Sequence, residues 1–387
     1  MTKVNIGFIG TGYRSSIYIN LMKTLNLFNI TGLCDLNEHS LNTFKNEFIK
    51  DEKCFTTTNL EDFINNSNID IYFICTPDNT HKYIALECLK KGKHIVLEKP
   101  IATTHDDCME IYNQYKLNKN IHIFIPFVLK YTKIFNNIKN LISENAIGKI
   151  HFMKYSMILS KLHMGAYHRR WHKSSSLSGG LINTKGCHDI DMICWLLNEK
   201  IIKIKSEGSL KTLTERNKPV NASTNCKTCI YNNVCEFRYS NKYVYENALD
   251  IENLDKCVYN EKLKDLVDYQ KTTFELTNDI KCEYIIDIDN HGTRILEIKG
   301  ENGKILCDTH KRYIKILDND GNIINEQILE SFTDFKDIHD GGDINFLKEI
   351  YNSFITNNFI DIKEEIDHNI YSLLSEKSRL LDKIIEL

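Results

Sequence analysis

The sequence VNIGFIGTGYRS at Val4–Ser15 decides the fold expected for the first part of the chain. Val4–Ile9 is a short apolar strand, and Gly10-Thr-Gly12 follows it at once, before a helical pattern of apolar residues. Two glycines here let the backbone turn sharply and bring N–H groups towards a phosphate at a helix N-terminus, where the helix dipole favours negative charge. Ser15 stands where a third glycine is usual, and a small serine is tolerable at this helix–strand contact.

The alternation of strand and helix continues to about residue 125. Further apolar strands are expected at Ile30–Cys34, Ile69–Cys75, His94–Leu97 and His122–Phe127. Strands that alternate with helices favour a doubly wound parallel sheet with right-handed crossovers. We therefore expect residues 1–125 to form a Rossmann nucleotide-binding domain.

An acidic residue, Asp35, ends the second strand roughly 20 residues after the glycine loop, where a carboxylate accepts the ribose hydroxyls of NAD. Leu36 and Asn37 follow it, so no Arg or Lys stands there to hold the 2′-phosphate of NADP. The alternative role for Asp35 is to cap the next helix. The sequence predicts NAD as the cofactor.

The stretch GKHIVLEKP at Gly92–Pro100 reads as a buried strand that delivers Lys99 to the carboxyl end of the sheet, where ligands bind in open α/β folds. Hydride transfer from a secondary alcohol needs a base that titrates near neutrality, and partial burial or positive neighbours lower the pKa of a lysine. Lys99 is the expected base, with Glu98 positioning it. The Lys99–Pro100 peptide bond is a candidate for the cis form.

Three motifs together resemble the Gfo/Idh/MocA oxidoreductases: Gly10-x-Gly12, Thr76-Pro77 with His81, and Glu98-Lys99-Pro100. The later segment SGGLINTKGCHDID at Ser178–Asp191 looks like the family's second signature, in which a glycine pair leads into a histidine and an aspartate. The resemblance covers essentially the whole chain. It implies that residues 126–387 form a second α/β domain whose large, mostly antiparallel sheet covers the nicotinamide and often mediates dimers or tetramers.

The resemblance places cofactor contacts in the loops that follow the strands of the first domain. These are Gly10, Gly12, Tyr13, Arg14, Asp35, Thr76, Pro77, Asn79, His81, Glu98 and Lys99. A surface position in the first turn of a helix is the alternative for His81.

The second signature supplies the expected partners of Lys99, because chemistry should gather where the two domains meet. His188 is expected to share the substrate hydroxyl or relay its proton, with a satisfied core histidine as the alternative. Family members usually carry an acid where Thr184 stands, so Lys185 is expected to serve as a second polar group and Thr184 to contact substrate. Asp191, one helical turn after His188, is expected to orient it or bind substrate.

The sequence His168-Arg169-Arg170-Trp171 is similar to a motif found in part of the family. Aromatic rings stack on the C–H-rich faces of sugars, and arginine supplies forked donors. Arg169, Arg170 and Trp171 are therefore expected to bind substrate, with a solvated basic patch as the alternative for the two arginines.

Short alternating or β-branched runs predict a meandering sheet in the second domain. The strands are expected at Lys149–Leu159, Lys200–Gly208, Thr272–Leu276, Cys282–Asp287, Thr293–Lys299, Lys304–Cys307 and Arg312–Leu317. Helical patterns occur at Asp189–Leu197, Gly342–Ile355 and Glu364–Ile385.

Four cysteines, Cys226-x2-Cys229-x5-Cys235 and Cys257, lie in a Lys- and Asn-rich insertion at about 217–260. Four thiolates at such spacing favour a tetrahedral zinc that folds a loop with few apolar residues. An iron–sulfur cluster, or free or disulfide-bonded cysteines, are the alternatives. A closed four-cysteine site leaves no open position for catalysis, so we expect it to have no chemical role.

Composition limits the classes of partner. A formal net charge of −3 over 387 residues creates no strong field for nucleic acid or an anionic membrane. No apolar run reaches the ~18 residues of a membrane span, and no signal peptide is seen at MTKVNIGFIG. We expect a cytoplasmic protein that forms homodimers or homotetramers.

The leading hypothesis is an NAD-dependent dehydrogenase acting on a sugar, polyol or glycoside. A redox-neutral glycosidase is the second, in which oxidation at C3 allows elimination, and water and hydride are then returned. A non-catalytic NAD-binding sensor or scaffold is the third, motivated by Thr184 in the place of an acid.

Overall fold

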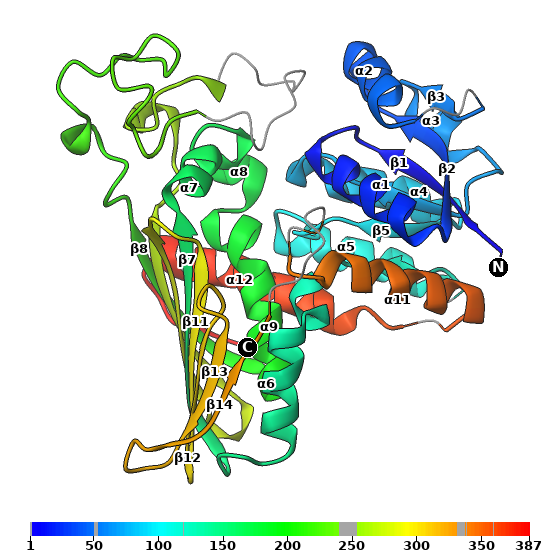
Figure 1. Cartoon of the computed structure of the whole chain (residues 1–387). Coiled ribbons are helices and arrows are strands. Elements are labelled where there is room, and N and C mark those ends of the chain that lie inside the picture. The colour runs from blue at the N-terminus through cyan, green and yellow to red at the C-terminus, as the bar shows by residue number, and fades with distance from the viewer. Residues whose placement is uncertain are drawn as a thin grey trace. The chain divides into compact units, whose positions relative to one another are not determined.

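The computed structural model describes residues 2–49, 53–118, 120–239, 254–330, 337, 339–358 and 360–387. Its described residues form two compact units (Figure 1). The first contains Met1–Tyr131 and Thr333–Asp367, and the second contains Thr132–Ser240, Glu252–Phe332 and His368–Leu387. No helix in these ranges is long and apolar enough to cross a membrane.

The first unit is built on a parallel six-stranded sheet. Its strands are β1 (Val4–Ile9), β2 (Phe28–Cys34), β3 (Phe55–Thr57), β4 (Ile71–Ile74), β5 (His94–Leu97) and β6 (Ile123–Phe124). Their order is β3-β2-β1-β4-β5-β6, and each neighbouring pair is parallel. This order confirms the doubly wound nucleotide-binding fold, in which the order of successive strands reverses between β1 and β4.

Helices cover both faces of this sheet. They are α1 (Tyr13–Leu25), α2 (Glu38–Phe48), α3 (Leu60–Ile64), η1 (Asp78–Thr80), α4 (His81–Lys90), α5 (His105–Lys116), η2 (Val128–Tyr131) and α11 (Gly342–Thr356). Successive residues of β1 point to opposite faces of the sheet. Ile6 and Phe8 lie in the core under α1. Gly7 points to the other face, where a Cβ would lie 3.0 Å from Phe63 of α3.

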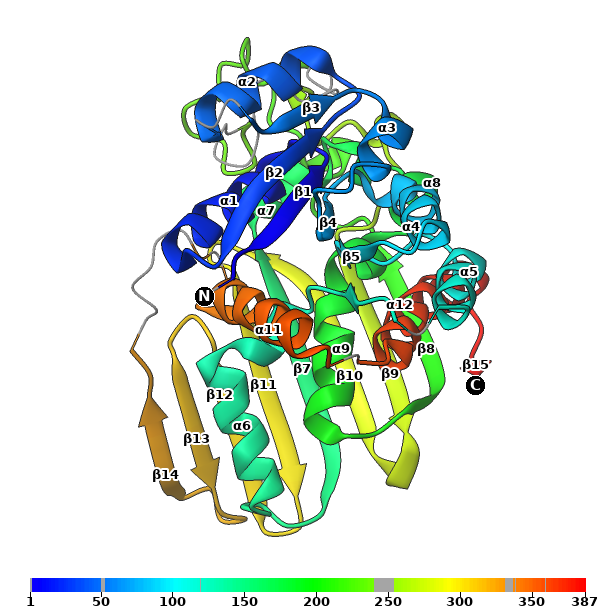
Figure 2. The same cartoon turned by 90° about the vertical axis from the view of Figure 1, so that its right-hand side faces the viewer.

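Helix α11 returns to the first unit although it lies more than 200 residues beyond the sheet strands. Ile344, Phe346, Leu347 and Ile350 join the same buried core as α1, and α1 and α11 lie side by side in Figures 1 and 2. The division expected at residue 125 lies near the break at Tyr131, but α11 falls in the first unit rather than the second. Helix α11 packs on the first unit because burial of its apolar face against the Rossmann core removes that face from water.

The second unit contains a nine-stranded sheet. Its strands are β7 (Ile150–Ser160), β8 (Ile201–Ser209), β9 (Tyr269–Leu276), β10 (Lys281–Asp289), β11 (Thr293–Gly300), β12 (Gly303–Asp308), β13 (Tyr313–Leu317), β14 (Ile323–Ile328) and β15 (Ile385–Glu386). The order is β14-β13-β12-β11-β7-β10-β9-β8-β15, and only the β7–β10 pair is parallel. The expected mostly antiparallel sheet is confirmed.

One face of this sheet packs against helices and the other is open. The helical segments of the second unit are α6 (Lys133–Ser143), α7 (Lys161–Tyr167), η3 (Trp171–Lys173), α8 (Ser175–Ser178), η4 (Ile182–Gly186), α9 (Cys187–Leu197), η5 (Glu215–Asn217), η7 (Glu261–Leu263), η8 (Thr277–Asp279) and α12 (Lys363–Leu381), which belongs to the unit from His368 onwards. Figure 2 shows α6 and α9 lying across the sheet. Strand β9 alternates strictly between buried and half-exposed residues, as a sheet with one covered face requires.

Candidate active site

The glycine loop after β1 has the backbone that its sequence predicts. Gly10 has φ +91°, and a Cβ there would lie 2.8 Å from the carbonyl oxygen of Cys75, so only glycine fits. Gly12 is different, because a Cβ at this position would meet no atom within 4 Å. Its backbone therefore borders open space at the N-terminus of α1, where backbone N–H groups favour an anion.

Asp35 is held beside this loop at the carboxyl end of β2. One of its oxygens accepts hydrogen bonds from the Thr11 backbone N–H and hydroxyl, both at 2.8 Å, and the other accepts from the Asn37 N–H at 2.9 Å. The cap of the following helix is Asn37, whose side chain accepts from Ser40. The capping alternative for Asp35 is therefore not what the structure shows.

Lys99 follows β5 at the same edge of the sheet. It is half-buried, and its backbone N–H donates to Glu98 Oε2 at 3.2 Å. The Lys99–Pro100 peptide bond is cis, as the sequence suggested. Since β1, β2 and β5 are parallel, Lys99, the glycine loop and Asp35 all lie at the carboxyl ends of strands in one sheet.

A buried polar network ties this edge to α11. Arg14 donates to Glu98 and Asp343, each at 2.5 Å, and to the Tyr18 hydroxyl at 2.8 Å. Tyr18 donates in turn to Glu98 at 2.6 Å, and His339 Nδ1 lies 2.7 Å from Asp343. The Arg14 guanidinium is therefore fixed from three sides.

Charge pairing sets the protonation states in this network. Burial alone would raise the pKa of Glu98, but Arg14 and Tyr18 hold it below its usual value. Burial likewise opposes ionisation of Asp343, yet Arg14 and His339 hold its pKa well below the ordinary range. Both carboxylates therefore carry negative charge at neutral pH and stabilise Arg14.

His81 fixes the loop instead of facing a ligand. Only 1% of its surface is exposed, and its ring nitrogens lie 2.7 Å from the Pro100 carbonyl oxygen and 3.0 Å from that of Thr76. The expectation of a direct cofactor contact does not fit this geometry, because the backbone occupies both nitrogens. Thr76, Pro77 and Tyr13 are half-buried beside the loop, and Asn79 is exposed.

These residues fit a bound dinucleotide. The open space at Gly12 admits a pyrophosphate close to the backbone, and Asp35 keeps acceptor capacity for ribose hydroxyls. Arg14 Nη1 is buried and has no hydrogen-bond partner among the described residues, so one guanidinium donor is available for an anionic or polar group.

The glycine pair of the second signature is required by packing in the second unit. Gly179 and Gly180 have φ +74° and +93°, and a Cβ at Gly180 would lie 2.5 Å from the Glu376 carboxyl carbon. Buried Asn183 accepts from Asn369 and Ser372 of α12 at 3.1 and 2.8 Å. The pair thus lets the segment approach α12 closely.

The expected catalytic residues Lys185 and His188, and the expected substrate contacts Thr184 and Asp191, lie in one π-helical turn and the start of α9. Thr184, Lys185, His188 and Asp191 are all buried, with 1%, 8%, 3% and 1% of their surface exposed. Their spacing of four and then three residues puts Thr184, His188 and Asp191 on one helical face. A π-helical turn often marks a functional site.

Asp191 has a partner that the sequence did not indicate. Its Oδ1 lies 2.8 Å from His368 Nδ1, whereas its Oδ2 is buried without a hydrogen-bond partner in the described part of the chain. Burial opposes charge on His368, but Cys194 and Asp191 hold its pKa well above the usual value. A charged His368 thus orients Asp191 and leaves one oxygen available.

Asp189, which lies between the two signature residues, has a structural role. It accepts from Arg294 at 2.5 Å and from the hydroxyls of Tyr155 and Tyr284 at 3.0 and 2.8 Å. This buried ion pair joins α9 to the sheet.

The residues of the Arg-Arg-Trp motif have different surroundings. Arg169 is 4% exposed, and its guanidinium contacts Cys226 and backbone carbonyls of the insertion, so it does not present donors to a substrate as expected. Arg170 and Trp171 are half-buried at η3, where Trp171 stacks on His172 with ring centroids 4.3 Å apart. The Trp171 indole nitrogen is buried and has no partner among the described residues.

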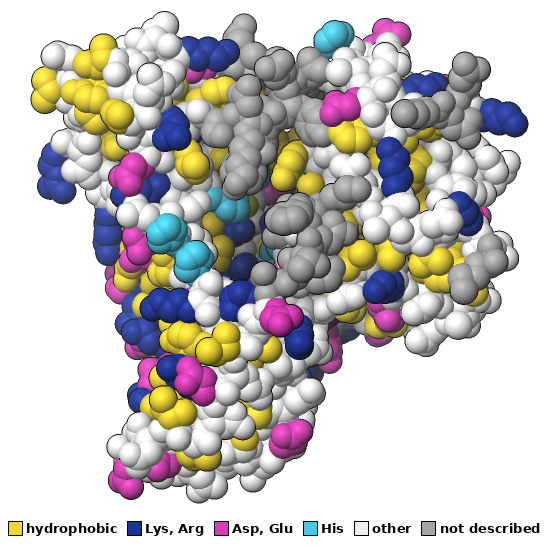
Figure 3. All heavy atoms as spheres, in the orientation of Figure 1, with side chains coloured by type: hydrophobic (Ala, Val, Ile, Leu, Met, Phe, Trp, Pro, Cys, Tyr) yellow, Lys and Arg dark blue, Asp and Glu magenta, His cyan; other side chains and the backbone are white. Residues whose placement is uncertain are grey.

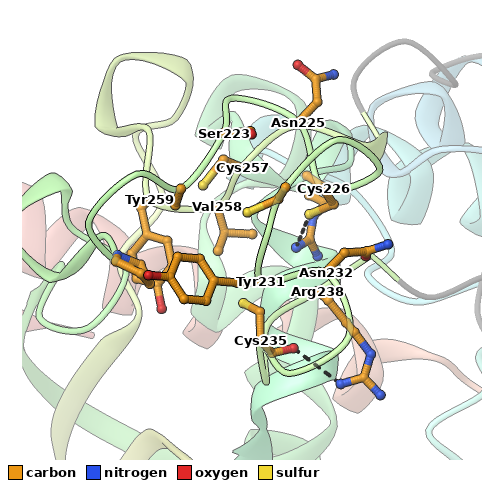
Figure 4. Close-up of a pocket in the computed structure, with 14 residues that line it drawn as sticks. Ser223, Asn225, Cys226, Tyr231, Asn232, Cys235, Arg238, Cys257, Val258 and Tyr259 are labelled. Carbon is orange, nitrogen blue, oxygen red and sulfur yellow. Dashed lines mark hydrogen bonds between the residues drawn. The ribbon is translucent and has the colours of Figure 1, made fainter.

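The expected zinc site is not supported. The four cysteines line one cavity, shown in Figure 4, but no group of three or more His, Cys, Asp or Glu side chains in the described ranges is arranged to hold a metal ion. A tetrahedral zinc needs four sulfurs about 2.3 Å from one centre. The four cysteines do not form such a centre, so the prediction of a structural zinc is wrong.

Comparison with family models agrees with the geometry of both units. Residues 4–125 match the oxidoreductase family model with an NAD-binding Rossmann fold, and residues 135–306 match the GFO/IDH/MocA C-terminal domain. The described order of the first sheet and the mostly antiparallel second sheet are consistent with these two matches.

Curated relatives align with part of the chain. The putative oxidoreductase YteT of Bacillus subtilis is 25% identical over 211 residues, 53% of this chain and 49% of that protein. Myo-inositol 2-dehydrogenase of Thermotoga maritima is 24% identical over 207 residues, 54% of this chain and 59% of that protein. The alignments thus span about half the length of these relatives.

Solved structures are similar over the whole chain. Myo-inositol 2-dehydrogenase from Lactobacillus plantarum has a TM-score of 0.73 at 16% identity and covers 100% of both chains. Levoglucosan dehydrogenase in complex with NADH and levoglucosan has a TM-score of 0.75 at 15% identity and covers 100% of this chain and 99% of that one. At these identities the likeness is one of fold. With both family models matched, the chain belongs to the Gfo/Idh/MocA family of oxidoreductases.

Proposed function

We propose that this protein is an NAD-dependent oxidoreductase that transfers hydride between NAD and a secondary alcohol of a sugar, polyol or glycoside. The observation that carries the proposal is the position of Lys99 at the carboxyl end of β5, in the sheet edge that also holds the glycine loop and Asp35. The names of relatives support the substrate class, since they include a myo-inositol 2-dehydrogenase and a glucose-6-phosphate 3-dehydrogenase.

Lys99 acts as the base in this scheme. NAD, when bound, supplies the hydride acceptor. Lys99 Nζ takes the proton of the reacting hydroxyl, which makes release of hydride from the same carbon favourable. Glu98 keeps the end of β5 in place, because Arg14 and Tyr18 hold its carboxylate while it accepts from the Lys99 N–H.

The second unit binds the sugar hydroxyls. Asp191 Oδ2, which has no partner among the described residues, accepts a hydrogen bond from one hydroxyl, and the Trp171 indole N–H donates to the oxygen of another. Both atoms are buried, and a buried polar atom without a partner costs about 1–3 kcal/mol that a hydroxyl-bearing substrate recovers. His188 shares the proton of the reacting hydroxyl. Thr184 stands where family members usually carry an acid, and Lys185 serves as the second polar group in its place.

The open face of the second sheet is the proposed contact between copies of the chain. Ile285, Ser156 and Ile295 lie opposite one another on β10, β7 and β11, and 42% of the Ile295 surface is exposed. Two partly exposed isoleucines, Ile285 and Ile295, on an uncovered sheet face favour association. Sedimentation velocity that shows only monomer at micromolar concentration would contradict a dimer or tetramer.

The test is a screen of inositols, sugars and glycosides with NAD and with NADP. We expect NADH formation with at least one polyol or sugar, and weaker reaction with NADP because Leu36 and Asn37 offer no cation. Aglycone release without net NADH would instead establish the redox-neutral glycosidase. Tight NAD binding without turnover of any compound would favour a sensor or scaffold.

A further inference from the structure

The cysteine-rich insertion packs against one segment of the second unit, residues 161–178, which contains α7, η3 and α8 (the α7–α8 segment). The described residues of both belong to that unit. The α7–α8 segment carries Arg170 and Trp171, the two residues of the Arg-Arg-Trp motif that remain candidates for contact with substrate. Contacts on either side of Trp171 therefore decide where its ring lies.

Arg169 is the first anchor and lies two residues before Trp171. Only 4% of its surface is exposed, and its guanidinium donates to the backbone carbonyls of Phe237 and, at 3.1 Å, of Lys256. Because Phe237 and Lys256 come from different parts of the insertion, one side chain joins both parts to the α7–α8 segment. The planar guanidinium has five N–H donors and can make several such bonds at once.

Asp265 is the second anchor and binds the chain just after Trp171. Its side chain accepts from the backbone N–H and the hydroxyl of Ser175 at 2.6 and 2.7 Å. Its own backbone N–H donates to the carbonyl oxygen of Lys173 at 3.1 Å. Asp265 lies in the chain that leads from the insertion to β9, so contacts with this part of the chain bracket Trp171 on both sides.

Helix α7 also approaches the insertion closely. A Cβ at Gly165 would lie 3.1 Å from the Phe237 carbonyl oxygen and 3.0 Å from Arg169 Nη1, which is tighter than ordinary van der Waals contact. Lys161, at the start of α7, forms an ion pair with Glu236 of the insertion. The helix thus packs against the same stretch of backbone that Arg169 binds.

The insertion can support this segment because its own parts are tied together. A β-bridge pairs Asn225 with Lys256, and backbone hydrogen bonds of 2.7 and 2.8 Å flank it. The rings of Phe237 and Tyr259 are buried and lie edge to face, with centroids 6.0 Å apart. The two carbonyls that Arg169 binds therefore belong to residues that the bridge and this ring pair hold in place.

The outer surface of the insertion contributes little to its attachment. Val220, Ile230 and Val234 are at least 69% exposed, and hydrophobic side chains gather over these loops at the upper left of Figure 3. An apolar side chain that stays in water gives little stabilisation. The attachment of the insertion to the α7–α8 segment therefore depends on Arg169 and Asp265.

We propose that the insertion positions Trp171 for substrate through Arg169 and Asp265, an inference that rests on the function proposed above. The Trp171 indole N–H is buried without a partner among the described residues, and its ring stacks on His172 with centroids 4.3 Å apart. A donor on a fixed ring selects ligands that place a hydroxyl oxygen within hydrogen-bond reach. Arg169 and Asp265 are positioning residues, because they act through Trp171.

The fluorescence of Trp171 tests its position without any need for turnover. The chain contains two tryptophans, so Trp195→Phe leaves Trp171 as the single emitting indole. In this background, Arg169→Ala and Asp265→Ala should each shift the emission to longer wavelength and increase quenching by acrylamide, because the ring becomes less enclosed. Arg169→Lys and Asp265→Asn keep part of the donor or acceptor set and should restore much of the parent emission.

Steady-state kinetics test the consequence for substrate. With a compound from the screen, Arg169→Ala and Asp265→Ala should raise KM about tenfold, as loss of one hydrogen bond does, with little change in kcat. The Kd for NAD should stay the same. Arg238→Ala is the matched control, since Arg238 donates to the Cys235 carbonyl within the insertion at 3.2 Å, and it should keep the parent emission and KM.

Unchanged Trp171 emission in Arg169→Ala and Asp265→Ala would overturn the proposal, as would a shifted emission with an unchanged KM. An equal shift in Arg238→Ala would refute the particular roles of the two anchors. Absence of turnover in the parent chain would instead contradict the proposed function, and the emission of the variants would still decide whether the insertion positions Trp171.

Discussion

The two units differ in how their buried charged side chains are paired. In the first unit, Arg14, Glu98 and Asp343 contact one another at 2.5 Å and hold the edge of the sheet rigid. In the second unit, Asp191 is held on one oxygen only, and the Trp171 indole N–H has no partner in the described ranges. Under the function proposed above, the paired network prepares the cofactor site in advance, and the less fully paired atoms of the second unit serve the substrate.

Lys99→Ala should give the largest effect, because it removes the base without touching the paired network. We expect kcat to fall by about 10²–10⁴, the usual contribution of general acid–base catalysis, while the Kd for NAD changes little. Steady-state kinetics with a substrate from the screen and NADH fluorescence titration measure the two quantities. Activity equal to that of the parent chain would break the assignment of Lys99.

Asp343→Asn tests whether the first unit depends on its ion pairs. Removing one partner of a buried pair costs about 3 kcal/mol of unfolding free energy, measured by urea denaturation, since Arg14 keeps its charge and loses one of its two carboxylate partners. Glu47→Gln, an exposed acid of α2, should change stability by less than about 0.5 kcal/mol. Equal stability of the two variants would show that the network is not needed.

Asp343→Asn also tests how the stability of the first unit depends on pH. The pKa values of Asp343 and Glu98 are lowered in the folded state, so their contribution is complete above the unfolded value of about 4 and is lost as the pH falls below it. Asp343→Asn should therefore flatten the loss of stability between about pH 4 and pH 2. If the free energy of unfolding of Asp343→Asn and of the parent chain falls equally between about pH 4 and pH 2, the prediction is wrong.

Two glycine substitutions separate ligand space from packing. Gly12→Ala should leave stability within about 0.5 kcal/mol, since its Cβ meets no atom, yet weaken NAD binding about tenfold by occupying space at the loop. Gly180→Ala should cost about 1–3 kcal/mol, because its φ is +93° and its Cβ would overlap Glu376. Thermal unfolding measures the stability of each variant, and NAD titration measures its Kd for NAD. Loss of stability in Gly12→Ala with weaker NAD binding in Gly180→Ala would contradict both assignments.

His368→Ala should give the smallest effect and test the second unit. Without its partner, Asp191 loses its orientation, so we expect KM for the substrate to rise several-fold, with a smaller change in kcat. His368→Gln keeps a donor for Asp191 and should recover much of the lost affinity. An unchanged KM in His368→Ala would show that Asp191 does not bind substrate.

Particular residues show why some features were predictable. Strand β1 and strand β5 occur where predicted, at Val4–Ile9 and His94–Leu97, because a fully buried parallel strand is a short apolar run between turn residues. Strands β3 and β14 escaped prediction, since Phe55–Thr57 is three residues long and Ile323–Ile328 is almost wholly exposed. A strand without a buried face leaves little pattern in the sequence.

The sequence by itself determined the buried strands of the first sheet such as β1 and β5, the glycine loop and the places of Lys99 and Asp35, because the loop and both residues lie directly beside strands that their own apolar residues specify. Only the tertiary structure decided that Arg14 pairs with Asp343, that His368 orients Asp191 and that Arg169 faces the cysteines. These pairs join residues from 57 to 329 positions apart. Such partners are selected by packing between elements, and local periodicity carries no information about them.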